Sequence, residues 1–195
     1  CQEVMSHEIV ISSSPKVEVS KDYYGNQVGN FNILEFHSET VIESRMLVRV
    51  NHSMKIPEID NIMAKDIASD IATNISLTRL CYPDVIEKQA DIDLILDEMD
   101  YSNKSIIAIV QECSQYIFEN FTYTTGITNI ETTVDEILEI KKGVCQDFAH
   151  LLLQLVRTAG IPARYVSGYI CPNESGFRGE GATHAWVEIY SPKQG

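Results

Sequence analysis

The sequence predicts an α+β protein, and the order of its periodic patterns is the reason. Residues 1–56 carry strand signals, residues 102–159 carry apolar positions at helical spacing, and residues 163–190 return to strand-like runs. We divide the chain into an N-terminal β-rich region with a helical, acidic connector over residues 1–95 and a core domain over residues 96–195. Hydrophobic residues make up 44% of the chain and charged residues 22%, a balance typical of folded proteins.

The first region has the pattern of an antiparallel β domain. Val17 and Val19 alternate with charged residues, and a β-branched run extends from Thr40 to Val50. Between them, residues 22–26 contain Gly and Asn, which tolerate positive φ and therefore predict a turn. Residues 57–100 have apolar residues near helical spacing, and the stretch 84–99 is acidic, so we expect short helices or an acidic connector there.

Two helices are expected next. Ser102 or Ser105 can cap the first, which ends near Asn120. The second covers residues 133–141, where Thr133 and Glu136 have the spacing of a capping box. The expected buried stripe of the first helix is Ile106, Ile109, Val110, Cys113, Ile117 and Phe118.

A third, strongly apolar helix opens at Cys145 and ends at Gly160, and Pro162 prevents it from resuming. Its expected buried stripe is Phe148, Leu151, Leu152, Leu155 and Ala159. Asp147, His150, Gln154 and Thr158 are expected on the opposite, polar side. Strands are predicted over residues 163–170 and 183–190, joined by a loop that holds three glycines and one proline in residues 172–181.

Charge and cysteine content exclude several classes of function. The formal net charge of −13 disfavours nucleic acid and anionic membranes as partners, because both require clustered positive charge. Apolar runs are far shorter than the roughly 20 residues of a membrane helix, and no signal peptide is visible. The five cysteines form no CxxC pair, so we expect neither a metal site nor a disulfide framework, but free thiols in the reducing cytoplasm.

Cys145 is the candidate nucleophile. It stands in the first turn of the third helix, where free backbone N–H groups and the positive end of the helix dipole favour a thiolate. The alternative is a small core residue, but Gly143 permits an exposed turn and the polar Gln146 and Asp147 follow, which favours the catalytic interpretation.

His184 is the candidate base. Strand alternation places it on the face of Trp186 and Glu188, opposite an apolar face, at the start of the last strand and beside the glycine-rich loop. A histidine in that position can reach a thiol on a neighbouring element. The alternative is a strand histidine that makes a single structural hydrogen bond.

Three sequence blocks, taken in order along the chain, resemble a known protein family. They are GVCQDFAH at residues 143–150, AGIPARYVSGY at residues 159–169 and THAWVE at residues 183–188. Together they resemble the transglutaminase-like core, most closely its bacterial branch labelled cysteine proteases, over about residues 103–190. Residues 22–28 (DYYGNQV) and the β run after them also resemble the β domain that precedes this core in bacterial members.

The resemblance implies a papain-like core, in which a nucleophile helix packs on antiparallel strands behind a partial antiparallel β domain. It also implies a Cys-His-Asp triad with Cys145 as nucleophile and His184 as base. The acid of the family lies on the next strand, so we expect it beyond Gly195, with residues 96–195 truncated before the last strands of the domain. Glu188 is no substitute, because four residues along a strand span about 13 Å.

Three further groups are expected around the nucleophile. The backbone N–H of Cys145 can act as an oxyanion donor. Asp147 serves as a helix-start charge or hydrogen-bonding anchor, and Tyr123 is a candidate for lining the cleft or for simple packing.

The reaction implied is thiol-dependent acyl transfer on an amide or peptide bond, with hydrolysis of a peptide or protein substrate preferred and no cofactor required. Two alternatives use the same fold: a transamidating cross-linker and a non-catalytic peptide-binding module. In a third alternative, the β region is a docking domain that binds a partner, and the core domain is only attached to it. The oligomeric state is left open.

Overall fold

The computed structural model describes residues 2–50, 61–169 and 183–192, and it divides the chain into two compact units, Cys1–Pro57 and Glu58–Gly195. The boundary differs from the expected one at residue 95. The acidic connector contains helix α3 (Gln89–Glu98), which buries Ile92, Ile95 and Leu96 in the core of the second unit. The loop expected at residues 172–181 lies outside the described residues.

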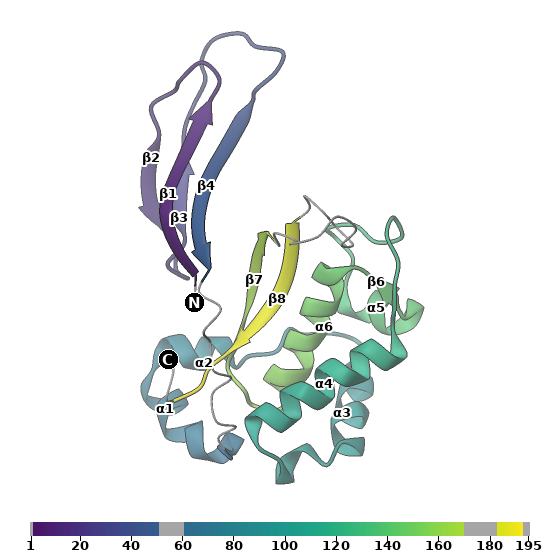
Figure 1. The fold of residues 1–195 in the computed structure, drawn as a ribbon. Helices are drawn as coiled ribbons and strands as arrows, with labels where there is room; N and C mark the ends of the chain where they lie inside the picture. Colours follow the sequence, from purple (N-terminus) through teal and green to yellow (C-terminus); the bar gives the residue numbers. More distant parts are fainter. Residues whose placement is uncertain (1, 51–60, 170–182, 193–195) are drawn as a thin grey trace. The chain divides into compact units, whose positions relative to one another are not determined.

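The first unit consists of two antiparallel strand pairs (Figure 1). Strand β1 (Gln2–Ile11) pairs with β4 (Ile42–Val50), and β2 (Glu18–Lys21) pairs with β3 (Gln27–Asn30). The predicted turn is confirmed: Gly25 has a φ of 84°, and the backbone N–H of Asn26 donates to Oδ1 of Asp22 at 2.8 Å. The β character and the antiparallel pairing of this region are therefore those that its sequence predicts.

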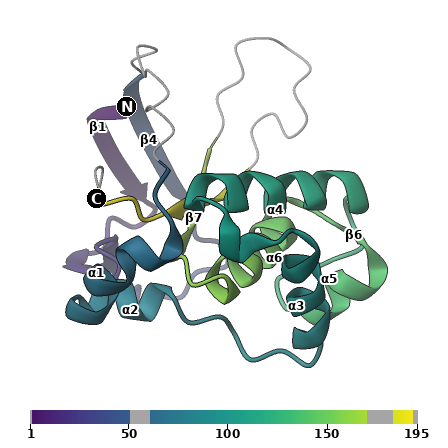
Figure 2. The same ribbon diagram turned by 90° about the horizontal axis from the view of Figure 1, so that it is seen from below.

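The second unit is built around one long helix, α6. Figure 1 shows α6 between the β7–β8 pair and helices α3 and α4, and Figure 2 shows α3, α4 and α5 grouped around it. The elements in chain order are a 3-10 turn (Ala64–Ile67), α1 (Ala68–Thr73), α2 (Ile75–Leu80), α3, a second 3-10 turn (Tyr101–Asn103), α4 (Ile106–Asn120), β5 (Thr122–Tyr123), α5 (Val134–Ile140), β6 (Lys142–Gly143), α6 (Cys145–Thr158), β7 (Ala163–Tyr169) and β8 (Thr183–Ile189).

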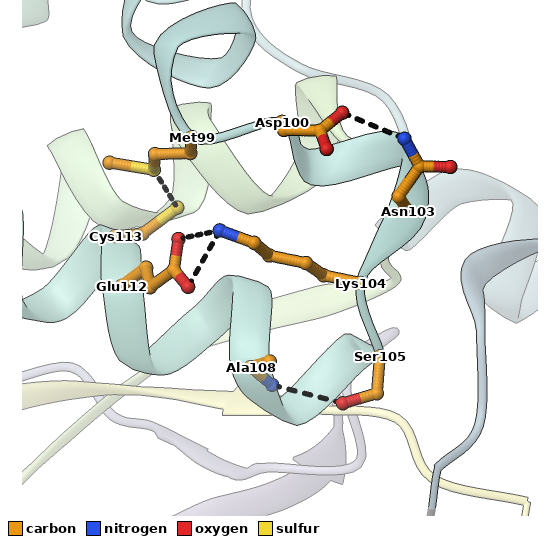
Figure 3. Close-up of polar contacts among 8 residues, drawn as sticks. All are labelled: Met99, Asp100, Asn103, Lys104, Ser105, Ala108, Glu112 and Cys113. Atoms are coloured by element: carbon orange, nitrogen blue, oxygen red, sulfur yellow. Dashed lines mark hydrogen bonds and ion pairs between the residues drawn. The ribbon is translucent and has the colours of Figure 1, made fainter.

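The three predicted helices of the core are present, and the two predicted caps are confirmed. Ser105 caps α4 by accepting a hydrogen bond from the Ala108 N–H at 3.3 Å (Figure 3). Thr133 and Glu136 form the predicted capping box of α5, since each side chain accepts from the other's backbone N–H. One stripe residue was predicted wrongly: Phe118 is 80% exposed, because it lies about 100° around the helix from the buried Ile117.

Helix α6 is more enclosed than the predicted amphipathic pattern indicates. Asp147 and Gln154, expected on a polar exposed side, are 3% and 2% exposed, so this prediction was wrong. Gln154 is buried because its amide fastens the loop before α3: Nε2 donates to the Asp84 carbonyl and Oε1 accepts from the Asp84 N–H. His150 does remain exposed. Within the described ranges, no helix combines the length and apolar character that a membrane crossing requires.

Candidate active site

The first turn of α6 is held by the carboxylate of Asp147. Its Oδ2 accepts two hydrogen bonds of 2.7 Å, from the backbone N–H of Val144 and from the hydroxyl of Thr128. Val144 is the N-cap residue, with extended backbone, and Cys145 is the first residue of the helix. Asp147 therefore fixes the turn that presents Cys145, as a buried hydrogen-bonding anchor.

Gly143 is required by this arrangement. A Cβ at this position would lie 2.8 Å from Oδ2 and 2.9 Å from Cβ of Asp147, which is closer than side chains pack. The Asp147 side chain thus folds directly over the backbone of residue 143. Gly143, two residues before Cys145, therefore allows the Asp147 side chain to pack closely on the backbone at the helix start.

Tyr123 is brought to the same turn by a short parallel strand pair. Strand β5 pairs with β6 so that Tyr123 lies opposite Gly143, and the Thr124 N–H donates to the Gly143 carbonyl at 2.8 Å. The Tyr123 ring contacts the ring of Phe148 edge-on, with centroids 6.4 Å apart. Tyr123 therefore packs on α6, and it also lines the pocket described below. The packing and the cleft-lining roles considered for this residue are both compatible with its position.

His184 comes from the antiparallel pair β7–β8. In this register His184 lies opposite Gly168, and Glu188 lies opposite Arg164. The guanidinium of Arg164 donates twice to Oε2 of Glu188, at 2.9 and 2.7 Å, so these two side chains form an ion pair across the strands.

One pocket of about 260 Å³ joins these elements. Cys145 from α6, His184 from β8 and Tyr123 from β5 all line it, and both Cys145 and His184 are half-buried. Asp147 is not among the lining residues, since it lies beneath the turn. The full lining is Tyr123, Val144, Cys145, Gln146, Tyr165, Ser167, Thr183, His184 and Ala185.

Tyr165 is a pocket residue that sequence reasoning missed. Burial raises the pKa of the Tyr165 hydroxyl, and electrostatic interactions with Cys145 and Asp147 add to that increase, so the phenol lies within electrostatic reach of both. Its ring stacks on His150, with centroids 5.0 Å apart and planes inclined by 17°. Alternation along the strand 163–170 was the available signal, because it separates Tyr165 from the exposed Arg164.

The other described thiols have a different environment. Burial is the main cause that raises the pKa of Cys113 to about 12, and Glu112 adds to it. Burial also raises the pKa of Cys81, an effect that Arg157 opposes. Neither cysteine lines the pocket of Cys145.

A larger cavity of about 670 Å³ shares no lining residue with the Cys145 pocket. Carboxylates dominate it, including Glu87, Asp135 and Glu139. Asp135 is already engaged there, since its two oxygens accept from the backbone N–H groups of Glu87 and Lys88. In the part of the chain that the structure describes, no group of three or more His, Cys, Asp and Glu side chains is arranged to hold a metal ion.

The fold and the Cys-His pocket define a class of protein, which the family comparison names. The model of the transglutaminase-like superfamily matches residues 95–195, and the chain belongs to that superfamily. The chain is also similar over 97% of its length to a crystal structure described as "a Putative Cysteine Protease from Cytophaga hutchinsonii", with a TM-score of 0.66, 20% identity and 62% of that chain covered. At this identity the likeness concerns the fold.

Two curated relatives cover more than nine tenths of the chain, and a third covers about half. An uncharacterized protein of Mycobacterium tuberculosis is 28% identical over 99% of this chain, and the chain spans 64% of the length of that relative. The uncharacterized protein YebA of Bacillus subtilis is 30% identical over 93% of this chain and 26% of its own length. A protein-glutamine gamma-glutamyltransferase of Pseudomonas aeruginosa is 31% identical over 52% of this chain and 16% of its own length.

Proposed function

We propose that this protein catalyses thiol-dependent acyl transfer on an amide or peptide bond, with Cys145 as nucleophile and His184 as base. The observation that carries the proposal is the shared pocket, which is lined by a cysteine at the first position of a helix and by a histidine from a separate strand. Membership of the transglutaminase-like superfamily supports the same chemistry. The acid of the triad stays assigned to a position after Gly195.

The proposed reaction begins with transfer of the Cys145 proton to the imidazole of His184. The thiolate sulfur attacks the amide carbonyl, and the backbone N–H of Cys145 donates to the oxyanion that forms. The C–N bond then breaks, and His184 returns the proton to the departing amine, which leaves a thioester on Cys145. Water, deprotonated by His184, attacks the thioester, releases the carboxylic acid and regenerates the thiol.

Asp147 and Tyr123 have supporting roles in this proposal. Asp147 accepts the hydrogen bond of the Val144 N–H and so holds the N-cap turn that presents Cys145. Tyr123 forms a wall of the pocket next to the nucleophile. The substrate is a peptide or protein amide, and a reducing compartment such as the cytoplasm would keep the thiol free.

Hydrolysis is our first choice, and transamidation is the alternative that a specific observation favours. The relative from Pseudomonas aeruginosa is named as a glutamyltransferase, in which an amine takes the place of water. A non-catalytic peptide-binding module is the remaining candidate, and it requires no reactive thiol in the pocket.

The first experiment measures alkylation of each cysteine by iodoacetamide from pH 5 to 9, using peptide mass spectrometry. We expect fast reaction of Cys145 near pH 6, and a slower reaction in the His184→Ala variant. Cys113→Ala is the matched control, since it removes a thiol outside the pocket. A Cys145 rate that equals the rates of Cys81 and Cys113 would favour the binding module.

A second experiment separates water from amine as the final acceptor. The chain is incubated with peptides, some of which contain glutamine, with and without a dansylated primary amine. Mass spectrometry then identifies the peptide products and any adduct on Cys145. Cleaved or deamidated peptide with no amine incorporated indicates hydrolysis. Incorporated amine indicates the cross-linking alternative, and Cys145→Ser must abolish either product.

A further inference from the structure

The indole of Trp186 lies directly on Gly168. A Cβ at residue 168 would be 2.7 Å from Cη2 of the indole and 3.4 Å from Cζ3, so any residue other than glycine would displace the ring. In the β7–β8 register, Trp186 is opposite Val166, and Gly168 is opposite His184. The indole therefore crosses diagonally to the strand position that faces the proposed base.

This placement fills the space across the strands from His184. Strand alternation puts His184, Trp186 and Glu188 on one face of β8, and their partners share that face. Glu188 is occupied by its ion pair with Arg164 at the far end. At the start of β8, the residue opposite His184 is Gly168, which has no side chain. The six-membered ring of the Trp186 indole fills the position that a side chain at residue 168 would take.

We propose that Trp186 is a positioning residue for His184, and that Gly168 is the residue that makes room for it. The indole occupies the volume into which the imidazole would turn across the strand pair, and so leaves the rotamers directed toward the pocket of Cys145. Side chains populate a few staggered rotamers, so blocking one of them concentrates the population in the others. The functional part of this inference rests on the proposed role of His184 as base.

The proximity of the Trp186 indole to the His184 imidazole can be tested by fluorescence, because Trp186 is the single tryptophan of the chain. A protonated imidazole quenches the emission of an indole beside it, and low pH favours the protonated form. At about pH 5.5 we expect stronger Trp186 emission in His184→Gln than in the parent. His150→Gln and Glu188→Gln are matched controls and should have the emission of the parent. Equal emission of the parent and His184→Gln overturns the proximity of the two rings.

The effect on the nucleophile is tested by the alkylation profile of Cys145. Trp186→Phe removes the part of the ring over Gly168, and Gly168→Ala displaces it. Small misplacements of reacting groups lower rates steeply, so we expect roughly tenfold slower alkylation at pH 6.5 in both variants, with a pH profile approaching that of His184→Ala. Glu188→Gln, on the same face but farther from the pocket, should keep the parent profile.

Thermal unfolding of each variant separates positioning from stability. A lowered midpoint with an unchanged alkylation profile overturns the positioning role. Should Gly168→Ala fail to fold, Trp186→Phe alone decides the question. If His184→Ala has the parent profile, the proposed base fails and the functional part of the inference fails with it, while the fluorescence comparison still reports separately whether the Trp186 indole lies beside His184.

Discussion

The first turn of α6 and the middle of α4 each hold a cysteine, and the two cysteines differ in burial and in their position along the helix. Cys145 is the first residue of α6, half-buried and on the wall of a pocket. Cys113 lies in the interior of α4, fully buried, with its sulfur 4.0 Å from that of Met99 (Figure 3). Both belong to apolar helices, so hydrophobic periodicity alone does not distinguish them.

The difference shows that position along a helix decides what a thiol can do. At a helix start the backbone N–H groups have no partners within the helix and can face a thiolate or an oxyanion. In a helix interior each N–H is already bonded to a carbonyl. Burial then leaves the Cys113 thiolate without solvation, which is why the pKa of this thiol rises to about 12.

The largest expected effect is the difference in reactivity between these two thiols. At pH 7.5 we expect iodoacetamide to modify Cys145 at least about a hundredfold faster than Cys113, because the second requires local opening and a thiolate that hardly forms. Peptide mass spectrometry over a time course measures both rates. In 8 M urea the two rates should converge, and comparable rates in the folded chain would contradict the comparison.

Next in size is a loss of stability at high pH that Cys113 causes. Since the pKa of Cys113 is about 12 in the folded chain and 9.0 for a free thiol, the folded chain binds this proton more tightly. The resulting stabilisation is complete below pH 9 and is lost as the pH rises toward 12. Between pH 9 and 11 the free energy of unfolding should fall by about 2.3 kcal/mol through this group.

Urea unfolding of the parent and of Cys113→Ala tests this, because only the difference between the two pH dependences belongs to Cys113. Cys145→Ala is the control and should keep the slope of the parent. An identical slope in the parent and in Cys113→Ala would show that the buried thiol does not titrate differently after folding.

The helix starts provide the third test. Asp147→Ala removes two hydrogen bonds to a buried carboxylate, so we expect a loss of about 2–3 kcal/mol in the free energy of unfolding. Ser105→Ala removes one hydroxyl cap from α4 and should lose about 1 kcal/mol. Urea unfolding measures both, and a larger loss at Ser105 than at Asp147 would reverse the order that burial predicts.

The smallest effect is that of the serine substitutions on stability. Cys113→Ser places a hydroxyl in an apolar core and should lower the free energy of unfolding by about 1–2 kcal/mol. Cys145→Ser, at a half-buried site open to the pocket, should change it by less than about 0.5 kcal/mol. Equal losses in thermal or urea unfolding would place both thiols in the same kind of environment.

Much of the local structure was predictable because it depends on neighbours in the chain. Ser105 and the pair Thr133 and Glu136 cap the helices they were expected to cap, since such hydrogen bonds span only three residues. The helix that begins at Cys145 and the strand that holds His184 are likewise where the periodicity indicates. The family resemblance at residues 143–150 and 183–188 agrees with the model match over residues 95–195.

Other features were not predictable, because they depend on elements far apart in the sequence. Gln154 is buried by its hydrogen bonds to the backbone of Asp84, 70 residues away in the sequence. Its polar side chain had instead predicted a position on the exposed side of the helix. Tyr165 borders the pocket because β7 packs on α6. Gly168 lies beneath Trp186 only in the register that pairs β7 with β8.

The sequence by itself determined the antiparallel β region, the three core helices, the last two strands, the superfamily resemblance and the two residues proposed for the chemistry, because short-range spacing encodes caps, turns and periodicity. The tertiary structure alone decided which surfaces of α6 are covered and which residues share a pocket with Cys145. It also showed that Asp147 holds the helix start from beneath. The physical reason is that burial and pocket shape arise from packing between distant segments, and no local pattern records which segments will meet.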